Sequence, residues 1–558
     1  MQLPCKVKDC TTTHFRDLVT RYLPWVFIVI FWIAIFSYRA STYTVLGGIS
    51  LVLSGVALVF LLSGKPKFSI YSVSFLVAFI WVLHSIKRAF WKEKFLFSDL
   101  TVLIDPANFE TAVHYPIPAL IALLAGLLVI YVSYRLYKSE KPLLRCLPRF
   151  LITLPIMGGC LWGSVYAIEK GQVAWLQSMP GGSNVIGNLM MSANLKYQSP
   201  ASRMASNEKF PEVTVAHGDT KTKPDLILLL QESTTNPLFY KGIDQTTMPA
   251  MTMFNSPAAT IQGPLRVHTY GGATWRSEFS ALTGLSSEDF APFSSSVFYS
   301  AVFHVQDSVI KRLKEAGYTV VVLSPFTEGS YNSGKAYRHL GVDDILHPAD
   351  LGYPANPNKN LWKIKTADML ALIKKTLARY EGPVAVYALT MQEHGPYPVE
   401  EVSSPKLKTM ADIEVSNEER LHLESYFQKL SDASQAVSAF DVWVKERKEP
   451  TIFVRFGDHQ PALRWKPGYT LSFERPDYIT HFALIDNRTE EHHTLTQLTD
   501  IVFLSGLFLE RMPIEQGQFF ATNSKMRQLC EGRYLDCPNK KLLRAYQNEI
   551  FVNQKIAE

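Results

Sequence analysis

The sequence predicts an α-helical membrane domain followed by an extracytoplasmic α/β domain with a largely parallel central sheet. Two observations lead to this fold class. Residues 21–168 of the 558-residue chain consist mainly of long apolar runs, whereas residues 220–530 have the mixed composition of a soluble domain. In the second region, short apolar runs alternate with helical stretches, which is typical of a parallel sheet covered by helices on both faces.

Five apolar segments in the first region are predicted to be transmembrane helices. Most of them approach or exceed the roughly 18–20 residues that cross a bilayer. The first is short, but further apolar segments follow it, so we interpret it as a retained span and not as a signal peptide. The segments cover residues 24–36, 42–63, 69–86, 117–134 and 150–168.

The basic residues of the loops predict the orientation in the membrane. Lysines and arginines precede the first span and occupy the second and fourth loops, which the positive-inside rule places in the cytoplasm. Everything after about residue 169 is then extracytoplasmic, which we interpret as the periplasmic side of a bacterial inner membrane. The third loop is also basic and carries aromatic residues, so we expect an interfacial helix near residues 87–110.

The charge and the cysteines restrict the partners and the compartment. The formal net charge of +6 comes mostly from residues that flank the membrane, so we predict no nucleic-acid partner. Of the six cysteines, only Cys530 and Cys537 fall on the predicted outside. Their spacing predicts a disulfide in an oxidising compartment, with two free thiols as the alternative. Such a disulfide favours a Gram-negative periplasm.

The soluble region divides into a linker and a catalytic domain. Residues 169–222 show little periodicity, whereas residues 223–558 begin with a buried-strand pattern. Several of the predicted strands are followed directly by polar residues, and ligands bind at the carboxyl ends of parallel strands. The predicted strands are 225–230, 319–324, 384–390 and 451–456, and the predicted helices are 277–282, 306–316, 366–380 and 421–448.

Three side chains at these strand ends suit a metal ion. Asp458 and His459 follow the last predicted strand, and Glu232 follows the first. A carboxylate and a neutral imidazole together are suitable ligands for Zn²⁺ or Mn²⁺. An Asp-His pair alone is more often part of a solvated turn, but the shared sheet edge favours one divalent cation.

A glycine-rich loop opens into a helix at residues 270–279, and its hydroxyls are candidate nucleophiles. A hydroxyl at a helix N-terminus lies where the dipole and the free N–H groups favour an anion. Beside a dication, the hydroxyl of Thr274 could ionise and attack an electrophile. The alternative is that Thr274 or Ser277 serves only as a helix N-cap.

Four short motifs occur in order along the soluble region. They are Glu-Ser at 232–233, Thr-x-x-Ser-Glu-Phe at 274–279, His-x-Pro-Tyr at 394–397 and Gly-Asp-His at 457–459. With five apolar spans before them, these motifs resemble the lipoteichoic acid synthase group of the alkaline phosphatase/sulfatase superfamily. Lys87 followed by the Phe-Ser-Asp-Leu run at 97–100 also looks like that group's interfacial segment.

The resemblance implies a function and a role for each matching residue. Enzymes of this group move a phospho-alcohol head group from a membrane phospholipid to an extracytoplasmic glycan or lipid acceptor. On that pattern Thr274 is the nucleophile, and it holds the metal together with Glu232, Asp458 and His459. His394 would bind the transferred phosphate or protonate the leaving group. The implied class is a phosphotransferase for substituted phosphate groups.

The loop after the second strand departs from the group's pattern. Ser324 stands where the group has a histidine, Tyr331 replaces a tryptophan and Ser333 replaces an arginine. Glu328 is an additional acidic residue, which suits an ammonium group better than a neutral diol. The sequence therefore favours phosphoethanolamine as the head group. The segment 394–396 resembles phosphoethanolamine transferases, although those enzymes lack the Thr-x-x-Ser-Glu-Phe motif.

Three further residues are candidates for substrate contacts. Asn332 lies in the same loop as Tyr331, and His268 and Arg276 flank the nucleophile. For His268, a core or surface histidine is the more common interpretation. Arg276 could pair with Glu278 near the nucleophile, and a surface helix pair between them is equally consistent with the sequence.

Other functions remain open. They are phosphoglycerol transfer, as in lipoteichoic acid synthases or periplasmic glucan modification, and phosphodiester hydrolysis, because water can replace the acceptor. Sulfatases need Cys/Ser-x-Pro-x-Arg, and residues 273–277 contain no proline, which argues against sulfatase chemistry. A non-catalytic scaffold would have lost at least one ligand, yet all four positions are intact.

Overall fold

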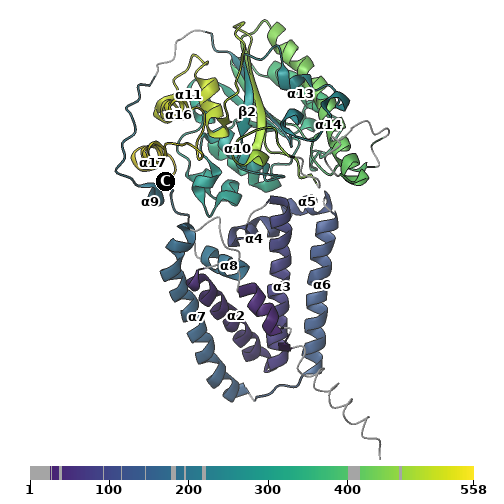
Figure 1. The fold of residues 1–558 in the computed structure, drawn as a ribbon, viewed down its shortest axis with the longest axis vertical. Coiled ribbons are helices and arrows are strands. Elements are labelled where there is room, and N and C mark those ends of the chain that lie inside the picture. Colours follow the sequence, from purple (N-terminus) through teal and green to yellow (C-terminus); the bar gives the residue numbers. More distant parts are fainter. Residues whose placement is uncertain are drawn as a thin grey trace, which may run out of the picture. The chain divides into compact units, whose positions relative to one another are not determined.

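The computed structural model separates into two units, Met1–Thr101 with Ala112–Leu195 and Val102–Thr111 with Lys196–Glu558. We call them the membrane unit and the catalytic unit and describe each by itself (Figure 1). The structure describes residues 25–26, 28–36, 41–91, 94–114, 116–144, 146–177, 184–193, 197–215, 222–399, 402, 415–463 and 468–558.

In the membrane unit, four of the described helices are long and apolar enough to cross a bilayer. Their length follows from uninterrupted apolar sequence, since a helix needs about 20 such residues to span the hydrocarbon core. Helix α2 packs against α7 and α3, and α3 packs against α6. The four are α2 (Thr42–Ser63), α3 (Pro66–Trp91), α6 (Pro116–Ser139) and α7 (Cys146–Gln177).

The span count differs from the predicted five. The predicted first span, 24–36, lies partly outside the described residues, and within it residues 25–26 and 28–36 are helical. The other predicted spans correspond to α2, α3, α6 and α7. The helices are longer than predicted at most of their ends because the apolar runs continue into amphipathic turns.

The described residues near 87–110, where we predict an interfacial helix, form several elements and not one helix. Instead α3 continues to Trp91, and short elements follow: α4 (Phe97–Ile104), η1 (Pro106–Asn108) and α5 (Phe109–His114). The cause lies partly in Lys87, whose Nζ is 2.7 Å from Asp99 Oδ2, with both side chains buried. Because this pair neutralises the lysine, Lys87 can stay inside the helix bundle instead of reaching the lipid phosphates.

The catalytic unit is built on a nine-stranded sheet with the order β4-β3-β5-β1-β6-β7-β2-β8, in which β9 also pairs with β2. From β4 to β6 the strands are parallel, and β7 is antiparallel to both of its neighbours. The strands are β1 (Asp225–Gln231), β2 (Ile261–Arg266), β3 (Thr319–Leu323), β4 (Asp344–Leu346), β5 (Val384–Leu389), β6 (Thr451–Gly457), β7 (Ile479–Asp486), β8 (His493–Thr494) and β9 (Thr499–Asp500). The predicted fold class is thereby confirmed.

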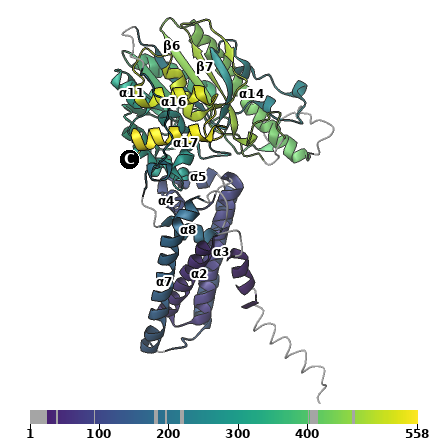
Figure 2. The ribbon, with the colours of Figure 1, turned by 60° about the vertical axis from the view of Figure 1, so that its left-hand side comes forward.

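Helices cover both faces of this sheet. Figure 1 shows α13 and α14 on one side and α11, α16 and α17 on the other, and Figure 2 shows the same layers from a second direction. The helices are α9 (Ala201–Met204), α10 (Thr274–Thr283), α11 (Val309–Glu315), α12 (Ser333–Leu340), α13 (Thr366–Arg379), α14 (Asn417–Glu446), α15 (Leu504–Leu509), α16 (Gly517–Leu529) and α17 (Lys540–Asn548).

The predicted linker, 169–222, is shared between the units. Helix α7 runs to Gln177, and α8 (Val185–Ala193) packs on α2 and α7 within the membrane unit. Helix α9 belongs to the catalytic unit, where Ser199 Oγ donates to the carbonyl of Ala557. The described part of this segment is therefore largely folded, although its sequence lacks clear periodicity.

Candidate metal centre and nucleophile

The sheet register places two carboxylates side by side. Strands β1 and β6 pair in parallel with Gln231 opposite Gly457, so Glu232 and Asp458 follow at the same edge. Gly457 allows this approach, because a Cβ built there would lie 1.8 Å from the carbonyl oxygen of Thr234. Only glycine fits at this point of the β6 end.

Glu232, Asp458 and His459 form a compact buried cluster whose ligand atoms all lie within 4.8 Å of one another. His459 Nε2 lies 3.3 Å from Glu232 Oε1 and 3.2 Å from Asp458 Oδ2. His459 Nδ1 is 3.0 Å from the carbonyl oxygen of Gln460. A carbonyl only accepts, so Nδ1 carries the proton and the lone pair of Nε2 points into the cluster.

The cluster fits a divalent cation. Asp458 Oδ2 and His459 Nε2 are fully buried and have no hydrogen-bond partner. Buried polar atoms without partners are rare in proteins and indicate a missing ion or water. Two carboxylates and one imidazole are a typical set of ligands for zinc or manganese, and a fourth ligand would complete a tetrahedral zinc site.

The pKa values of the three clustered residues also favour a bound cation. Burial alone would raise the pKa of Glu232, but the nearby His459 and His394 outweigh it and lower the pKa to about 2. Burial and the charge of Glu232 raise the pKa of Asp458 well above its ordinary value. Desolvation opposes charge on His459, yet the two carboxylates raise its pKa to about 9. The two carboxylates thus share the positive charge of one histidine. A dication would stabilise the ionised form of both.

Thr274 lies beside the cluster at the start of α10. Its Oγ1 donates a hydrogen bond of 3.0 Å to Glu232 Oε2. The loop before it turns sharply, with φ of +67° at Gly271, +152° at Gly272 and +63° at Ala273. Glycine tolerates such angles readily, and the turn directs the first residue of the helix at the cluster.

The N-cap alternative for these hydroxyls is wrong. The N-cap of α10 is Ala273, which offers no side-chain oxygen, and Thr274 is already helical. Ser277 Oγ donates 2.6 Å to the backbone carbonyl of Asp458, so it fixes the metal-site loop instead of capping the helix. Within the first turn, Arg276 N donates 2.9 Å to the carbonyl of Ala273, and the positive end of the helix dipole lies at Thr274.

His394 borders the cluster. Its Nε2 lies 4.0 Å from Glu232 Oε1, and its Nδ1 is 2.6 Å from the carbonyl oxygen of Gly395. The side chain is 14% exposed, whereas those of the three clustered residues are at most 2% exposed. His394 is therefore placed between the cluster and solvent.

His268 and Arg276 are buried and point to structural partners. The ring nitrogens of His268 face Asp500, at 3.1 Å, and the hydroxyl of Ser286, at 3.0 Å. Both nitrogens are therefore engaged. Arg276 Nε donates 3.1 Å to Ser287 Oγ, and because Arg276 and Glu278 are both buried, they do not lie on the surface as the alternative required.

Glu278 instead lies in the core behind the nucleophile. It is fully buried and accepts hydrogen bonds from the hydroxyls of Tyr337 and Tyr387. Burial raises the pKa of Glu278 to about 7. The Ser-Glu-Phe part of the motif thus anchors α10 to the sheet.

The loop after β3 differs from its predicted role in one respect. Glu328 is about half exposed and pairs with Arg338, so its charge is already balanced. Asn332 Nδ2 donates 2.7 Å to the carbonyl of Phe298. Tyr331 is buried, and its ring stacks on Trp275, the residue after Thr274, with centroids 5.7 Å apart.

Sequence reasoning missed an aromatic wall around this loop. Phe326 packs edge-on against Tyr331 and Trp362, with centroids 5.6 and 5.1 Å away. Trp362 in turn lies 5.3 Å from the ring of His394. The rings therefore link the nucleophile side of the site to His394. The aromatic residues that follow β3 were the available signal, but Trp362 comes from a segment without any motif.

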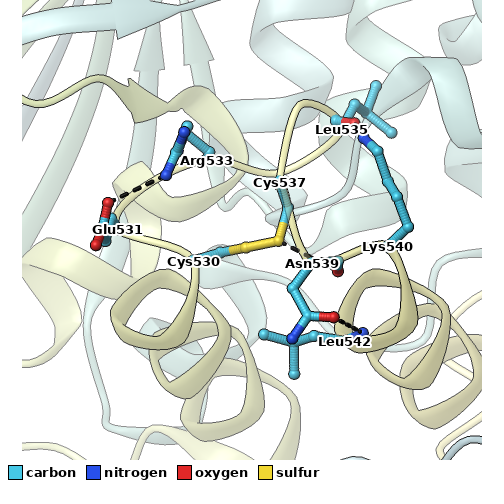
Figure 3. Close-up of a disulfide and its surroundings, with 8 residues drawn as sticks. All are labelled: Cys530, Glu531, Arg533, Leu535, Cys537, Asn539, Lys540 and Leu542. Carbon is cyan, nitrogen blue, oxygen red and sulfur yellow. Dashed lines mark hydrogen bonds and ion pairs between the residues drawn. A yellow bond between two sulfur atoms is a disulfide. The ribbon is translucent and has the colours of Figure 1, made fainter.

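Cys530 and Cys537 form a disulfide at the C-terminal end of α16, with Cα atoms 5.7 Å apart (Figure 3). Cys537 Sγ also lies 3.5 Å from the carbonyl oxygen of Asn539. Both cysteines are buried. The bridge closes the short connection between α16 and α17 and is remote in sequence from the metal ligands.

Comparisons of the sequence with known proteins identify a family and several relatives. The sulfatase family model matches residues 224–504. An uncharacterised protein of Haemophilus influenzae is 32% identical over 506 residues, which cover 87% of this chain and 90% of that protein. A Rhizobium meliloti protein, named as a candidate cyclic β-1,2-glucan modification protein, is 27% identical over 48% of this chain and 40% of its own length.

Among solved structures, the integral membrane protein lipooligosaccharide phosphoethanolamine transferase A of Neisseria meningitidis has a similar fold. The alignment covers 86% of this chain and 97% of that protein, with a TM-score of 0.50 and 14% identity. The likeness extends over both the helical and the α/β parts of the chain.

Proposed function

Because this chain belongs to the sulfatase family, we propose that it is a membrane-bound transferase. It moves a phospho-alcohol head group from a phospholipid to an extracytoplasmic glycan or lipid, through a phosphodiester on Thr274. One observation carries the proposal: the Thr274 hydroxyl lies at a helix N-terminus, 3.0 Å from a carboxylate of a buried metal-ligand cluster. This arrangement combines a nucleophile, a cation site and an anion site.

The residues divide the reaction into two displacements. Thr274 Oγ1 passes its proton to Glu232 Oε2, which accepts its hydrogen bond, and attacks the phosphorus of the lipid at the positive end of the α10 dipole. His394 donates a proton to the departing diacylglycerol oxygen and then removes one from the acceptor hydroxyl. The acceptor oxygen displaces Thr274 Oγ1 from the phosphorus and takes the head group away, while Glu232 returns the proton to Thr274.

Glu232, Asp458, His459 and Thr274 would hold one zinc or manganese ion. When bound, such a cation lowers the pKa of the threonine hydroxyl and neutralises charge on the phosphoryl oxygens. Glu232 has a separate part in orientation, since its Oε2 accepts the hydrogen bond that fixes Thr274 Oγ1. Ser233 fixes the carboxylates, because its hydroxyl donates to Glu232 and its backbone N–H to Asp458.

The proposed head group is phosphoethanolamine. Glu328 no longer supports this choice, because Arg338 already pairs with it. The aromatic wall supports it instead, since Trp275 and Trp362 are only partly buried and aromatic rings attract an ammonium group through cation–π interactions. The loop from 324 to 333 contains no lysine or arginine that would repel such a group.

The proposed location is the inner membrane of a bacterium, with the catalytic unit in the periplasm. The basic loops of the membrane unit and the Cys530–Cys537 disulfide support this orientation. On that side of the membrane, both phospholipid head groups and envelope glycans are within reach.

Mass spectrometry of the full-length protein tests the proposal. After incubation in vesicles with head-group-labelled phosphatidylethanolamine, we expect label on the peptide that contains Thr274. Thr274→Ala should lose all of the label, while Thr246→Ala, which changes an exposed threonine, should keep it. A labelled Thr274→Ala protein would refute the nucleophile.

Parallel incubations resolve the finer alternatives. Label from phosphatidylglycerol alone would replace phosphoethanolamine by phosphoglycerol and leave the threonine mechanism standing. Release of only free phosphoethanolamine, with no labelled glycan or lipid after addition of envelope extract, would identify a phosphodiesterase.

A further inference from the structure

A short segment between two membrane-spanning helices belongs structurally to the catalytic unit. Residues Val102–Thr111 follow α3 and α4 in the chain and precede α6, yet they group with Lys196–Glu558. Within this segment, Asp105, Asn108 and Glu110 each bond to residues of the catalytic unit. We call Asp105–Glu110 the anchor segment.

Asn108 makes the central contacts of the anchor segment. Its Oδ1 accepts a hydrogen bond of 3.0 Å from the backbone N–H of Tyr331. Its Nδ2 donates 2.9 Å to the hydroxyl of Tyr299, and that hydroxyl donates 3.1 Å to Asp105 Oδ2. One amide therefore joins the anchor segment to both Tyr331 and Tyr299.

A second set of bonds reaches the same loop through Asn360. The carboxylate of Glu110 accepts from the backbone N–H of Asn360 at 3.3 Å. The side chain of Asn360, which is buried, accepts from Thr327 N at 2.8 Å and from Ser330 Oγ at 3.0 Å. The anchor segment thus holds the loop after β3 at two points.

The loop needs such support because its backbone is strained. Tyr331 and Asn332 have φ of +40° and +63°, and neither is glycine. Consecutive left-handed residues persist only where surrounding bonds over-determine them. The Asn108 bond to Tyr331 N acts directly on the strained residue.

The strained residue also packs against the neighbour of the proposed nucleophile. The ring of Tyr331 stacks on Trp275, which follows Thr274, and packs against Phe326 in the aromatic wall. A shift of the Tyr331 backbone would therefore move the wall on the nucleophile side of the site. The position of the anchor segment and the position of the aromatic wall are therefore coupled through contacts within the catalytic unit.

We propose that Asn108 is a positioning residue that sets the aromatic wall beside Thr274 by holding Tyr331. It acts through Tyr331 and touches neither the cluster nor Thr274 in the hydrogen bonds described. The inference rests on the proposed function in one respect, the identification of this wall as part of the head-group site. The anchor itself is a structural statement and can be tested without chemistry.

The kinetic test uses the full-length protein in vesicles and follows labelling of Thr274 by phosphatidylethanolamine. Loss of one hydrogen bond to a strained loop should raise KM for the lipid about tenfold in Asn108→Ala, with kcat changed less than about threefold. Tyr299→Phe, which retains the Asn108–Tyr331 bond, should raise KM by only about threefold. The double variant should resemble Asn108→Ala, because the two side chains act as one unit.

Asn358→Ala is the matched control, since Asn358 is exposed and its side chain makes no described contact with the loop. Asn358→Ala should have the KM and kcat of wild type. A merely structural role for Asn108 would lower the active fraction, which reduces kcat and leaves KM unchanged. An unchanged KM in Asn108→Ala, with or without loss of kcat, would overturn the proposal.

Hydrogen exchange provides the measurement that is independent of chemistry. In Asn108→Ala, amides of residues 325–333 should exchange about tenfold faster, while the peptides that carry the cluster are unchanged. If the loop loosens but wild type never labels Thr274, the anchor stands and the proposed function fails. If wild type labels Thr274 and neither KM nor loop exchange responds, the anchor fails and the function stands.

Discussion

At the scale of single residues, the metal cluster depends on a position that carries no side chain. Gly457 lets the end of β6 pass against the Thr234 carbonyl, which brings Asp458 and His459 up to Glu232. The backbone N–H groups of Ser233 and His459 then both donate 2.8 Å to Asp458 Oδ1. This leaves Asp458 Oδ2 for a cation.

Gly457→Ala should therefore be severely destabilising. The new Cβ would overlap the Thr234 oxygen, and overpacking of a rigid backbone contact should lower the free energy of unfolding by about 3 kcal/mol or more. We expect a lower Tm and loss of labelling at Thr274, measured by thermal unfolding and mass spectrometry of the full chain.

Gly468→Ala is the matched control, because the nearest atom to its Cβ would be Lys241 Cβ at an ordinary 3.5 Å. It should unfold within about 0.5 kcal/mol of wild type. Equal stability of Gly457→Ala and wild type would show that the β6 end can move, contrary to the packing described.

At the scale of elements, the continuous apolar runs predicted β1, β3, β5 and β6, because fully buried parallel strands need little else. Strands β2 and β7 were missed. The sequence of β2 contains Gly263 and Pro264, which ordinarily argue against a strand, and β7 mixes polar with apolar residues although all are buried. Tertiary packing decides these elements, and local pattern does not.

The same distinction between local pattern and tertiary packing applies to the candidate site. Glu232, Asp458 and His459 could be predicted because they follow two of those strands, and the structure brings them together. The aromatic wall and the anchor segment could not be predicted from the sequence. Trp362 and Asn108 reach the site only through contacts between residues far apart in the chain. The assignment of their roles in catalysis remains a prediction.

The docking of the C-terminal helix α17 predicts a pH effect on stability. Asp289 is buried in η5 (Ser287–Phe290). Its carboxylate oxygens lie 2.6 Å from the hydroxyl of Tyr534 and 3.2 Å from Nε2 of Gln547, and Gln547 is part of α17. Burial raises the pKa of Asp289 to about 7 from 3.8. The folded state therefore holds this proton more tightly than the unfolded state, and stability falls as pH rises from about 4 to about 7.

Asp289→Asn should remove this part of the pH dependence, because an amide does not titrate. We expect the Tm of wild type to fall more between pH 5 and pH 8 than that of Asp289→Asn. Asp432→Asn, at an exposed position of α14, should keep the wild-type slope. Identical slopes for wild type and Asp289→Asn would show that burial does not protonate Asp289.

At the scale of the whole molecule, the two units belong to one chain, so insertion of the membrane unit would tether the catalytic unit to a bilayer, where the proposed donor lipid is concentrated. A covalent tether of this kind raises the local concentration of one reactant without any new contact. The fold of the catalytic unit should in turn respond to its cation, because three buried ligands lie at the ends of two central strands.

Removal of metal should therefore lower the stability of the catalytic unit. Chelation should decrease the Tm, and zinc or manganese should restore it, with about 2.7 kcal/mol gained at a metal concentration one hundred times the dissociation constant. Asp458→Asn should bind less metal by elemental analysis and lose this response. A Tm that rises equally with metal in Asp458→Asn and wild type would place the cation elsewhere.

The strand at each end of the sheet has a bearing on the solubility of the protein. One end is the three-residue β4, and beyond β2 lie only the two-residue strands β8 and β9, which pair on either side of Pro264. Pro264 has no N–H to offer, so neither rim of the described sheet presents a long row of unpaired backbone groups. A second chain would find no template on which to add a strand. At high protein concentration, the described sheet should resist the edge-to-edge association that leads to aggregates.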